Sequence, residues 1–279
     1  MGTQLSQSSM KTLFSCPAKY AHKKVFNTPM DADYEEADSL GFGKAFHKVL
    51  EESLHTNATD KSILNAMEEF NVEKDQKDPL THMLNNYLKV HKASGLKVIK
   101  CELQIATPEF IGYIDFIAID NSGGWWLGDN KTAGRHDPSI LSRLHRDYQL
   151  NLYSHFVDWI QNALPELEGR VFRGFRYRQS IKSKAKTLKG LIEGTPTYDI
   201  IVEASALEPK KAWEEFLLAH SVAESLHNGE EARRNYGACN DYFRPCEYFS
   251  QCHGNLASQP SKSVFVHTLE SLQDDDLLG

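Results

Sequence analysis

Two short runs in the middle of the chain combine strand-forming residues with charged side chains. Asp115 lies in the first run, GYIDFI, and Asp129 and Lys131 lie in the second, WWLGDNKT. Ile, Phe and Trp surround these charges, and residues 121–124 have the composition of a hairpin turn, so we expect two adjacent buried strands. Side chains alternate along a strand, which places Asp129 and Lys131 on one face and Asn130 on the other. The sequence therefore predicts two carboxylates and an ammonium group in one pocket.

These three side chains could bind a divalent metal ion and use it to cleave nucleic acid. Asp and Lys are almost never fully buried unless they are paired. Mg²⁺ suits such a pocket because it takes one or two carboxylates and fills its remaining positions with water and phosphate oxygens. The ion can lower the pKa of a bound water and offset charge on the scissile phosphate. Lys131 could orient that water or stabilise the developing negative charge.

Two further motifs lie on predicted helices. GKAFH, upstream of the strands, ends at His47, and QLNLY, downstream, begins at Gln149 and ends at Tyr153. Residues four apart share a helix face, so Gln149 and Tyr153 could face an entering DNA strand or simply pack against the core. A histidine such as His47, taken alone on an apolar helical stretch, is more often a core residue than a metal ligand. Glu102, on the predicted strand before Asp115, is a further carboxylate that could reach the metal directly or through water.

The order of these motifs resembles the PD-(D/E)XK nuclease superfamily, and within it the RecB-like exonucleases and the CRISPR-associated adaptation nucleases. The resemblance covers residues from about 6 to 252. It implies that Asp115 is the first metal-binding aspartate and that DNK, residues 129–131, is the (D/E)-x-K triplet. It also implies that His47, in a G-x-x-x-H element, is a metal ligand. In the same way it implies that Gln149 and Tyr153, in a Q-x-x-x-Y element, place the DNA strand.

We therefore predict a Mg²⁺- or Mn²⁺-dependent DNA exonuclease that acts on ends or single-stranded tails in recombination, repair or replication. In this prediction His47, Asp115 and Asp129 bind the metal, the backbone carbonyl of Asn130 is a further candidate ligand, and Lys131 acts on the water or the transition-state charge. A helicase, a recombinase or a single-strand-binding protein is an expected partner. The alternatives are a structure-selective endonuclease of the same fold, cutting flaps or processing CRISPR spacers, and a non-cutting DNA-binding subunit.

The five cysteines carry a second signal. No charged-then-apolar signal segment precedes them, and an odd count argues against a disulfide framework. Cys16 lies early in the chain, whereas Cys239, Cys246 and Cys252 lie close together near its end. This arrangement resembles that of iron–sulfur nucleases in the superfamily, which implies a 4Fe–4S cluster held by the four thiolates. The late spacing, C-x₆-C-x₅-C, departs from the C-x₂-C-x₅-C of many relatives. A structural zinc site, in which His253 could replace one thiolate, and free thiols are the alternatives.

The elements that must position these residues alternate between helices and strands. Such mixing predicts an α/β fold with a central mixed sheet and helices on both faces. We expect a single nuclease domain over residues 1–254, with the cysteines joining its N- and C-terminal parts, and a flexible acidic tail over 255–279. Helices are predicted over 8–24, 43–54, 61–70, 79–92, 142–161 and 209–228, and strands over 96–105, 113–119, 125–131, 170–179 and 197–203.

Charge and composition agree with an intracellular enzyme. The net charge of −7 is unusual for a DNA-binding protein, but residues 170–189 contain eight basic and no acidic side chains. That stretch could be a phosphate track or a solvated strand and loop. The acidic end of the tail could recruit a partner or be solvated and disordered. No apolar run approaches the length that spans a membrane, so we expect a cytoplasmic protein without a membrane partner.

Overall fold

The computed structural model describes residues 3–31, 39–56, 60–183, 185, 187–241 and 244–253. The predicted acidic tail over 255–279 lies outside these residues. The chain divides into two compact units. Unit 1 consists of Met1–Phe14 and Glu35–Glu231, and unit 2 consists of Ser15–Tyr34 and Ala232–Gly279.

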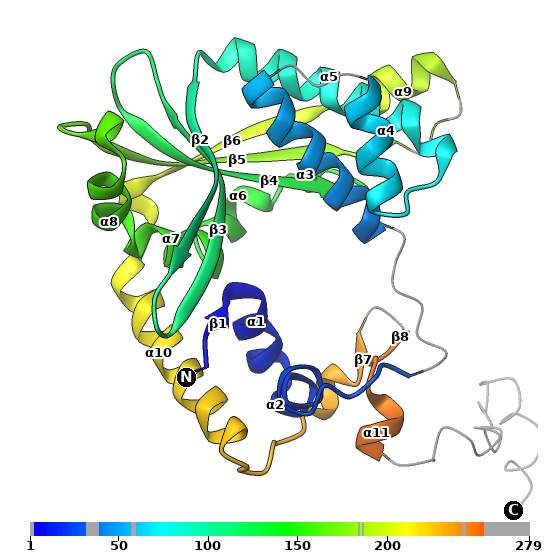
Figure 1. Ribbon diagram of the computed structural model, residues 1–279, viewed down its shortest axis with the longest axis vertical. Helices are drawn as coiled ribbons and strands as arrows, with labels where there is room; N and C mark the ends of the chain where they lie inside the picture. The colour runs from blue at the N-terminus through cyan, green and yellow to red at the C-terminus, as the bar shows by residue number, and fades with distance from the viewer. Residues whose placement is uncertain are drawn as a thin grey trace, which may run out of the picture. The chain divides into compact units, whose positions relative to one another are not determined.

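Unit 1 is built on a six-stranded mixed sheet (Figure 1). Its strands are β1 (Leu5–Ser6), β2 (Lys97–Ala106), β3 (Phe110–Ile119), β4 (Trp125–Ala133), β5 (Phe172–Ile181) and β6 (Thr197–Glu203). β3 pairs antiparallel with β2 and β4 and parallel with β1. β5 is parallel to β4, and β6 is antiparallel to β5. Mixed strand directions flanked by helices confirm the predicted fold class.

Helices cover both faces of this sheet. They are α1 (Gln7–Ser15), α3 (Ser39–Thr56), α4 (Asp60–Glu69), α5 (Lys77–Ser94), α6 (Ile140–Leu144), α7 (Tyr148–His155), α8 (Val157–Ala163), α9 (Leu188–Gly194) and α10 (Pro209–His227). The single helix predicted over 142–161 is wrong. Three short helices replace it because the Asp147 side chain caps α7 by accepting the backbone N–H groups of Gln149 and Leu150.

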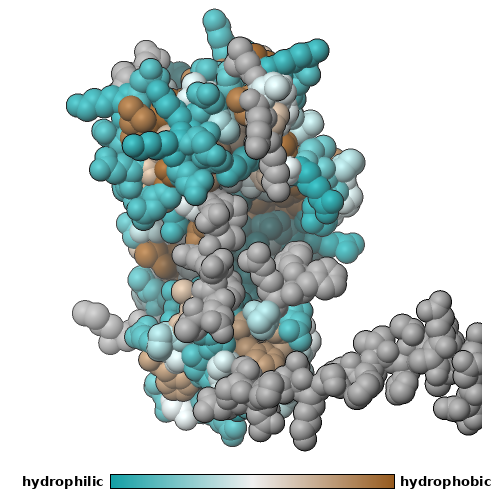
Figure 2. Space-filling view, turned by 90° about the vertical axis from the view of Figure 1, so that its right-hand side faces the viewer, coloured by the Kyte–Doolittle hydropathy of each residue, from teal (hydrophilic) through white to brown (hydrophobic). Residues whose placement is uncertain are grey.

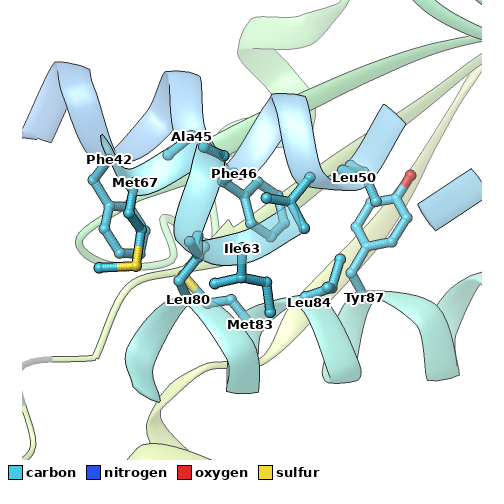
Figure 3. Packing of buried hydrophobic residues seen from close by; sticks show 12 residues of the cluster. Phe42, Ala45, Phe46, Leu50, Ile63, Met67, Leu80, Met83, Leu84 and Tyr87 are labelled. Atoms are coloured by element: carbon cyan, nitrogen blue, oxygen red, sulfur yellow. The ribbon is translucent and has the colours of Figure 1, made fainter. Parts of the chain in front are cut away.

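An apolar cluster holds α3, α4 and α5 together (Figure 3). On α3 the apolar residues recur every three or four positions, which places them on one face of the helix. Each fully buried Leu, Phe or Met contributes about 1.5–3 kcal/mol, so the cluster fixes α3 firmly against its neighbours. Tyr87, at the edge of the cluster in Figure 3, brings α5 into it. The other members are Phe42, Ala45, Phe46, Val49, Leu50, Ile63, Ala66, Met67, Leu80, Met83 and Leu84.

The β3–β4 hairpin sets the register of the two charged strands. Its turn lies at residues 121–124, as predicted. Phe116 pairs with Gly128, and a Cβ at position 128 would lie only 2.0 Å from the Phe116 ring. Glycine is therefore required where the ring crosses the neighbouring strand. The next residues along each strand, Asp115 and Asp129, come to lie side by side.

Unit 2 joins two segments that are distant in sequence. Its elements are α2 (Pro17–Tyr20), the π-helix η1 (Ala21–Val25), the 3₁₀ helix η5 (Tyr236–Ala238), β7 (Asn240–Asp241), β8 (Arg244–Pro245) and α11 (Phe249–His253). Lys19 forms an ion pair of 2.7 Å with Glu247, whose backbone carbonyl also accepts the Asp31 N–H. The helix predicted over 8–24 is interrupted because Cys16, with φ −159° and ψ 111°, is extended before Pro17.

The basic stretch over 170–189 does not form the continuous phosphate track that we considered. Arg178 is fully buried, and Arg176 forms an ion pair with Asp199 on β6. The Lys182 ammonium lies 4.1 Å from the centre of the Phe42 ring. Lys184 and Lys186 lie outside the described residues. Arg176 and Arg178 pair within the fold, so neither of the two alternatives for this stretch, a phosphate track or a solvated strand, holds for these two residues.

The surface of unit 1 is mainly hydrophilic on the face that Figure 2 shows, where the hydrophobic side chains of the described residues form scattered patches. Among the described residues, no helix combines the length and the apolar composition that crossing a bilayer requires.

Candidate metal centre

Three neighbouring strands bring three carboxylates into a row. Glu102 of β2 lies opposite Asp115 of β3, because the residues on either side of them are paired. Asp129 of β4 lies next to Asp115 on its other side. Like charges on adjacent strands repel each other, so this row destabilises the chain unless a cation compensates it. Asp115 is the middle member of the row.

His47 of α3 completes a group of three metal-binding side chains. Ligand atoms of His47, Glu102 and Asp115 all lie within 4.8 Å of one another, and His47 Nδ1 is 3.7 Å from Asp115 Oδ2. Among the described residues, no other group of three or more His, Cys, Asp or Glu side chains comes this close. The three side chains line an open pocket of about 670 Å³, whose wall also contains Lys131. Helix α3 thus brings the predicted histidine to the predicted aspartate.

Asp129 is buried, and its two oxygens differ sharply. Oδ1 accepts hydrogen bonds from Lys131 Nζ at 2.7 Å and from Gln149 Nε2 at 2.6 Å. Oδ2 is buried without a hydrogen-bond partner. An unpaired buried oxygen costs on the order of 1–3 kcal/mol, more when it is charged. A cation at Oδ2 would remove this cost.

The charges of Asp129 and Lys131 depend on each other and on burial. Burial raises the pKa of Asp129, and the neighbouring Asp115 carboxylate adds to the rise, although Lys131 opposes it. Burial alone would lower the pKa of Lys131, but the carboxylates of Asp129 and Asp115 outweigh it and raise that pKa. Lys131 therefore stays protonated beside the pocket. The predicted common face of Asp129 and Lys131 is confirmed.

Glu102 occupies a strained backbone conformation. Its φ is +49°, in the left-handed region, although it lies within the ten-residue strand β2. Such a conformation costs a non-glycine residue on the order of 1 kcal/mol and is typical of functional sites. Burial, followed by the charges of Asp115 and Glu51, raises the pKa of Glu102 to about 7. A cation beside this carboxylate would stabilise its charged form.

Gln149 and Tyr153 take different places on α7. The Gln149 side chain reaches Asp129, whereas the Tyr153 ring is buried and its hydroxyl accepts the Tyr113 N–H at 3.2 Å. A Cβ at Gly112 would lie 2.7 Å from the Tyr153 ring, so glycine makes room for it. Tyr153 thus holds α7 against β3, which positions Gln149. Direct contact of either residue with DNA stays a prediction.

Asn130 links the two faces of the sheet. Its backbone N–H donates to Asp115 Oδ2 at 2.6 Å, while its side chain points to the opposite face, as predicted. There its Oδ1 accepts a hydrogen bond from the Tyr87 hydroxyl, which in turn contacts Arg178. Sequence reasoning missed Tyr87 and considered Arg178 only as part of a basic surface stretch. The one sequence signal for this contact was Asn130 itself, a polar residue at a strand position that should face the apolar core.

His91 of α5 also contacts this buried arginine. Arg178 Nη1 lies 3.0 Å from His91 Nδ1. Burial, followed by the Arg178 charge, lowers the pKa of His91 to about 4, against the weaker opposing influence of Asp199. Neutral His91 can therefore accept a hydrogen bond from the guanidinium.

The pH dependence of stability should reflect this histidine. Below its ordinary pKa of 6.5, the unfolded chain binds a proton at His91 that the folded chain does not bind until about pH 4. Stability is therefore lost as the pH falls from 6.5 towards 4. His91→Gln keeps an acceptor without titrating. It should reduce the loss in unfolding free energy between pH 7 and pH 5 by about 1 kcal/mol, after discounting for partial exposure. Urea unfolding of both proteins at the two pH values measures this, and identical pH dependence would contradict it.

The site fits a hard divalent cation. Its donors are carboxylate oxygens and an imidazole, one buried Asp129 oxygen lacks a partner, and three ligand atoms converge on one point. Oxygen donors with imidazole suit Mg²⁺ or Mn²⁺. The residues whose ligand atoms converge to hold such an ion are His47, Glu102 and Asp115, whereas Asp129, next to Asp115 on β4, is outside this group. Such an ion would act as a Lewis acid on a phosphate and lower the pKa of a bound water.

A mixed sheet that presents carboxylates and a lysine around such a pocket defines a class of metal-dependent nucleases. The family model of the PD-(D/E)XK nuclease superfamily matches residues 4–253. The chain therefore belongs to the PD-(D/E)XK nuclease superfamily, as its motifs predicted. Membership implies metal-dependent cleavage of nucleic acid. A search of curated proteins found no match.

Unit 2 contains the four cysteines predicted to hold a cluster, Cys16, Cys239, Cys246 and Cys252. Cys16 is buried and its Sγ accepts the Asn235 N–H at 3.4 Å. Cys239 Sγ lies 3.4 Å from His253 Nε2, and the Cys246 N–H donates to the Cys239 carbonyl. Burial, followed by the influence of Cys16, raises the pKa of the Cys252 thiol. The early cysteine and the late cysteines thus belong to one compact unit.

Proposed function

We propose that this chain is a Mg²⁺- or Mn²⁺-dependent DNA exonuclease that acts on ends or single-stranded tails. The observation that carries the proposal is the pairing of Asp129 with Lys131 beside the group formed by His47, Glu102 and Asp115. Family membership supplies metal-dependent cleavage of nucleic acid, and the exonuclease assignment, the RecB-like branch and a role in recombination, repair or replication are part of this proposal. A helicase that unwinds ends, or a recombinase or single-strand-binding protein in the cytoplasm, would suit such an activity.

In this proposal each residue of the site has a separate task. Asp115, Asp129 and His47 hold the metal, and Glu102 and the backbone carbonyl of Asn130 are further ligands. The Lys131 ammonium, kept protonated by its carboxylate neighbours, orients the attacking water or stabilises the negative charge that develops on the phosphate. A proton leaves the water during attack, and a proton is taken up by the departing oxygen.

Gln149 would control the direction of Asp129. Its amide donates to the same oxygen that accepts from Lys131, whereas the other oxygen of Asp129 is buried without a hydrogen-bond partner. Tyr153, anchored to the Tyr113 backbone, keeps α7 beside the pocket. Orientation of this kind matters because small displacements of a catalytic group cost large factors in rate.

Digestion of two DNA forms tests this function. We expect end-labelled linear DNA to be degraded with Mg²⁺ or Mn²⁺ while covalently closed circular DNA stays intact. Lys131→Ala should slow this degradation by about 10²–10³-fold, because one charge-stabilising donor is lost. Cutting of the circle would replace the exonuclease by a structure-selective endonuclease, such as one acting on flaps or CRISPR spacers. No metal-dependent cutting of either DNA would indicate a non-cutting DNA-binding subunit.

Glu102 has a separate prediction because it lies on β2, outside the main motifs. Glu102→Gln should weaken Mn²⁺ binding by about 10-fold, since one charged ligand is lost and the neutral amide binds the ion less strongly. Isothermal titration calorimetry measures the affinity. Glu51→Gln is the matched control, because Glu51 lines the same pocket outside the group of converging ligand atoms. Equal losses in both variants would show that only the general negative charge matters.

We propose further that the cysteines of unit 2 hold a 4Fe–4S cluster. Four thiolates suit such a cluster, and the N–H donor at Cys16 Sγ is a contact that tunes cluster potentials. Zinc holds its sulfur ligands at about 2.3 Å, which would place them close together. Among the described residues, no three cysteine sulfurs lie within 4.8 Å of one another. Cys239 Sγ and His253 Nε2 lie 3.4 Å apart, so a zinc site with mixed cysteine and histidine ligands stays the alternative.

A further inference from the structure

Asn130 lies on β4 between Asp129 and Lys131 and contacts the candidate metal centre through Asp115. Its N–H donates to Asp115 Oδ2 at 2.6 Å, and its side chain accepts from the Tyr87 hydroxyl at 2.8 Å. Asn130 is only 3% exposed. One residue is therefore held on both sides of β4, by a carboxylate of the metal group on one face and by α5 on the other.

Tyr87 can serve as a rigid donor to Asn130. Its ring is fully buried in the apolar cluster of α3, α4 and α5. The Tyr87 hydroxyl donates to Asn130 Oδ1 at 2.8 Å. The Tyr87 oxygen accepts from Arg178 Nη1 at 2.9 Å. Because the Tyr87 oxygen accepts a hydrogen bond from Arg178, its own proton is directed at Asn130.

Arg178 is fully buried, which is unusual for a charged side chain. Its guanidinium also donates to Ser94 Oγ at 3.0 Å, contacts His91, and lies 3.6 Å from the Asp199 carboxylate. Its Nε has no hydrogen-bond partner among the described residues. Apolar residues of similar volume would often stabilise a fold equally well. Stability alone therefore does not account for this charge, whereas orienting the Tyr87 hydroxyl does.

We propose that Tyr87 and Arg178 are positioning residues of the metal centre, acting through the side chain of Asn130 from the opposite face of the sheet. This inference rests on the proposed function, because it assumes that the group around Asp115 binds metal. The N–H and the side chain of Asn130 branch from adjoining backbone atoms of β4, a strand that is also held by its pairing with β5, so a fixed side chain limits the movement of the N–H that donates to Asp115. The same constraint limits the movement of Asp129 and Lys131.

Loss of the Tyr87 hydroxyl should loosen this constraint. Contacts that orient metal ligands typically contribute a factor of 10–100 in metal affinity or activity. Tyr87→Phe keeps the ring in the apolar cluster and removes only the oxygen. We expect Mn²⁺ affinity to fall by about 10-fold and kcat at limiting Mn²⁺ to fall in proportion, while KM for DNA stays unchanged. If Tyr87 had a purely structural role, Tyr87→Phe would lower the thermal stability and leave Mn²⁺ affinity unchanged.

Hydrogen exchange in the metal-free protein supplies a readout that does not depend on activity. We expect amide exchange within β4 to accelerate about 10-fold in Tyr87→Phe, since the opening of this strand costs less free energy. Tyr198→Phe is the matched control. Tyr198 lies on β6, stacks on His136 with ring centres 3.9 Å apart, and takes no part in the contacts of Asn130. It should leave Mn²⁺ affinity and β4 exchange unchanged.

A second variant covers the case in which Tyr87→Phe folds poorly. Asn130→Leu removes the acceptor and keeps a side chain of similar size, so it should cause the same loss of Mn²⁺ affinity. The double variant with Tyr87→Phe should lose no more than either single variant, because both changes break one contact. Wild-type Mn²⁺ affinity and β4 exchange in folded Tyr87→Phe would overturn the inference. If the wild-type chain neither binds Mn²⁺ nor cuts DNA, the proposed function fails, and β4 exchange still decides whether Tyr87 positions Asn130.

Discussion

Asp115→Asn should abolish measurable Mn²⁺ binding and slow DNA cleavage by about 10³-fold, which corresponds to about 4 kcal/mol of lost transition-state stabilisation. Asp115 is the middle carboxylate of the row and the only member next to both Glu102 and Asp129. Asparagine keeps an oxygen that can accept the Asn130 N–H. The substitution therefore removes the charge and leaves the local packing in place. Calorimetry with Mn²⁺ and cleavage of linear DNA measure the two effects.

The variant Lys131→Ala separates metal binding from the cleavage of DNA. Lys131 donates to Asp129 but supplies no ligand to a cation, so this variant should bind Mn²⁺ and still cut DNA poorly. Asp115→Asn should lose both properties. It should also leave the metal-free protein at least as stable as the wild type, because one of three neighbouring negative charges is gone. Normal Mn²⁺ affinity in Asp115→Asn would show that the metal is held elsewhere.

The local geometry of Asp129 and Lys131 could be predicted from the sequence because it follows from strand alternation alone. The hairpin turn over 121–124 was equally clear, since its glycines can adopt the positive φ that tight hairpin turns require, as Gly123 does. Gln149 required one further step, the capping of α7 by Asp147, and sequence reasoning placed it on a helix with incorrect ends. These are short-range properties, which the order of residues specifies directly.

Contacts between distant elements could not be predicted in the same way. Arg178 and Tyr87 are separated by 91 positions, and only the packing of α5 on β5 brings them together. Charge alone made Arg178 a candidate for phosphate contact, because a sequence shows that a residue is basic but not that it is buried. The role of Glu102 depends on the β2–β3 register and on a left-handed backbone conformation, neither of which its neighbours in sequence reveal.

The proposed cluster in unit 2 should determine whether that unit is folded. Purified without oxygen, the wild-type chain should contain about four irons and four sulfides, as a 4Fe–4S centre requires. Cys16→Ser should contain far less iron, because it removes the single ligand from the early segment. Iron and sulfide assays on the two proteins measure this. One zinc and no iron in the wild type would replace the cluster by a structural zinc site.

Loss of the cluster should also expose both segments of unit 2 to proteases. The described parts of this unit are short, and units of this size usually need a metal or another cross-link to stay folded. We expect limited proteolysis within 17–31 and 232–253 to become at least about 10-fold faster in Cys16→Ser. Cys101→Ala, which removes the buried thiol of β2 in unit 1, should leave this rate unchanged. Asn235 donates its backbone N–H to Cys16 Sγ and its side-chain Nδ2 to the Ser15 carbonyl. Slow cleavage in Cys16→Ser would mean that such protein contacts hold the two segments together without a cluster.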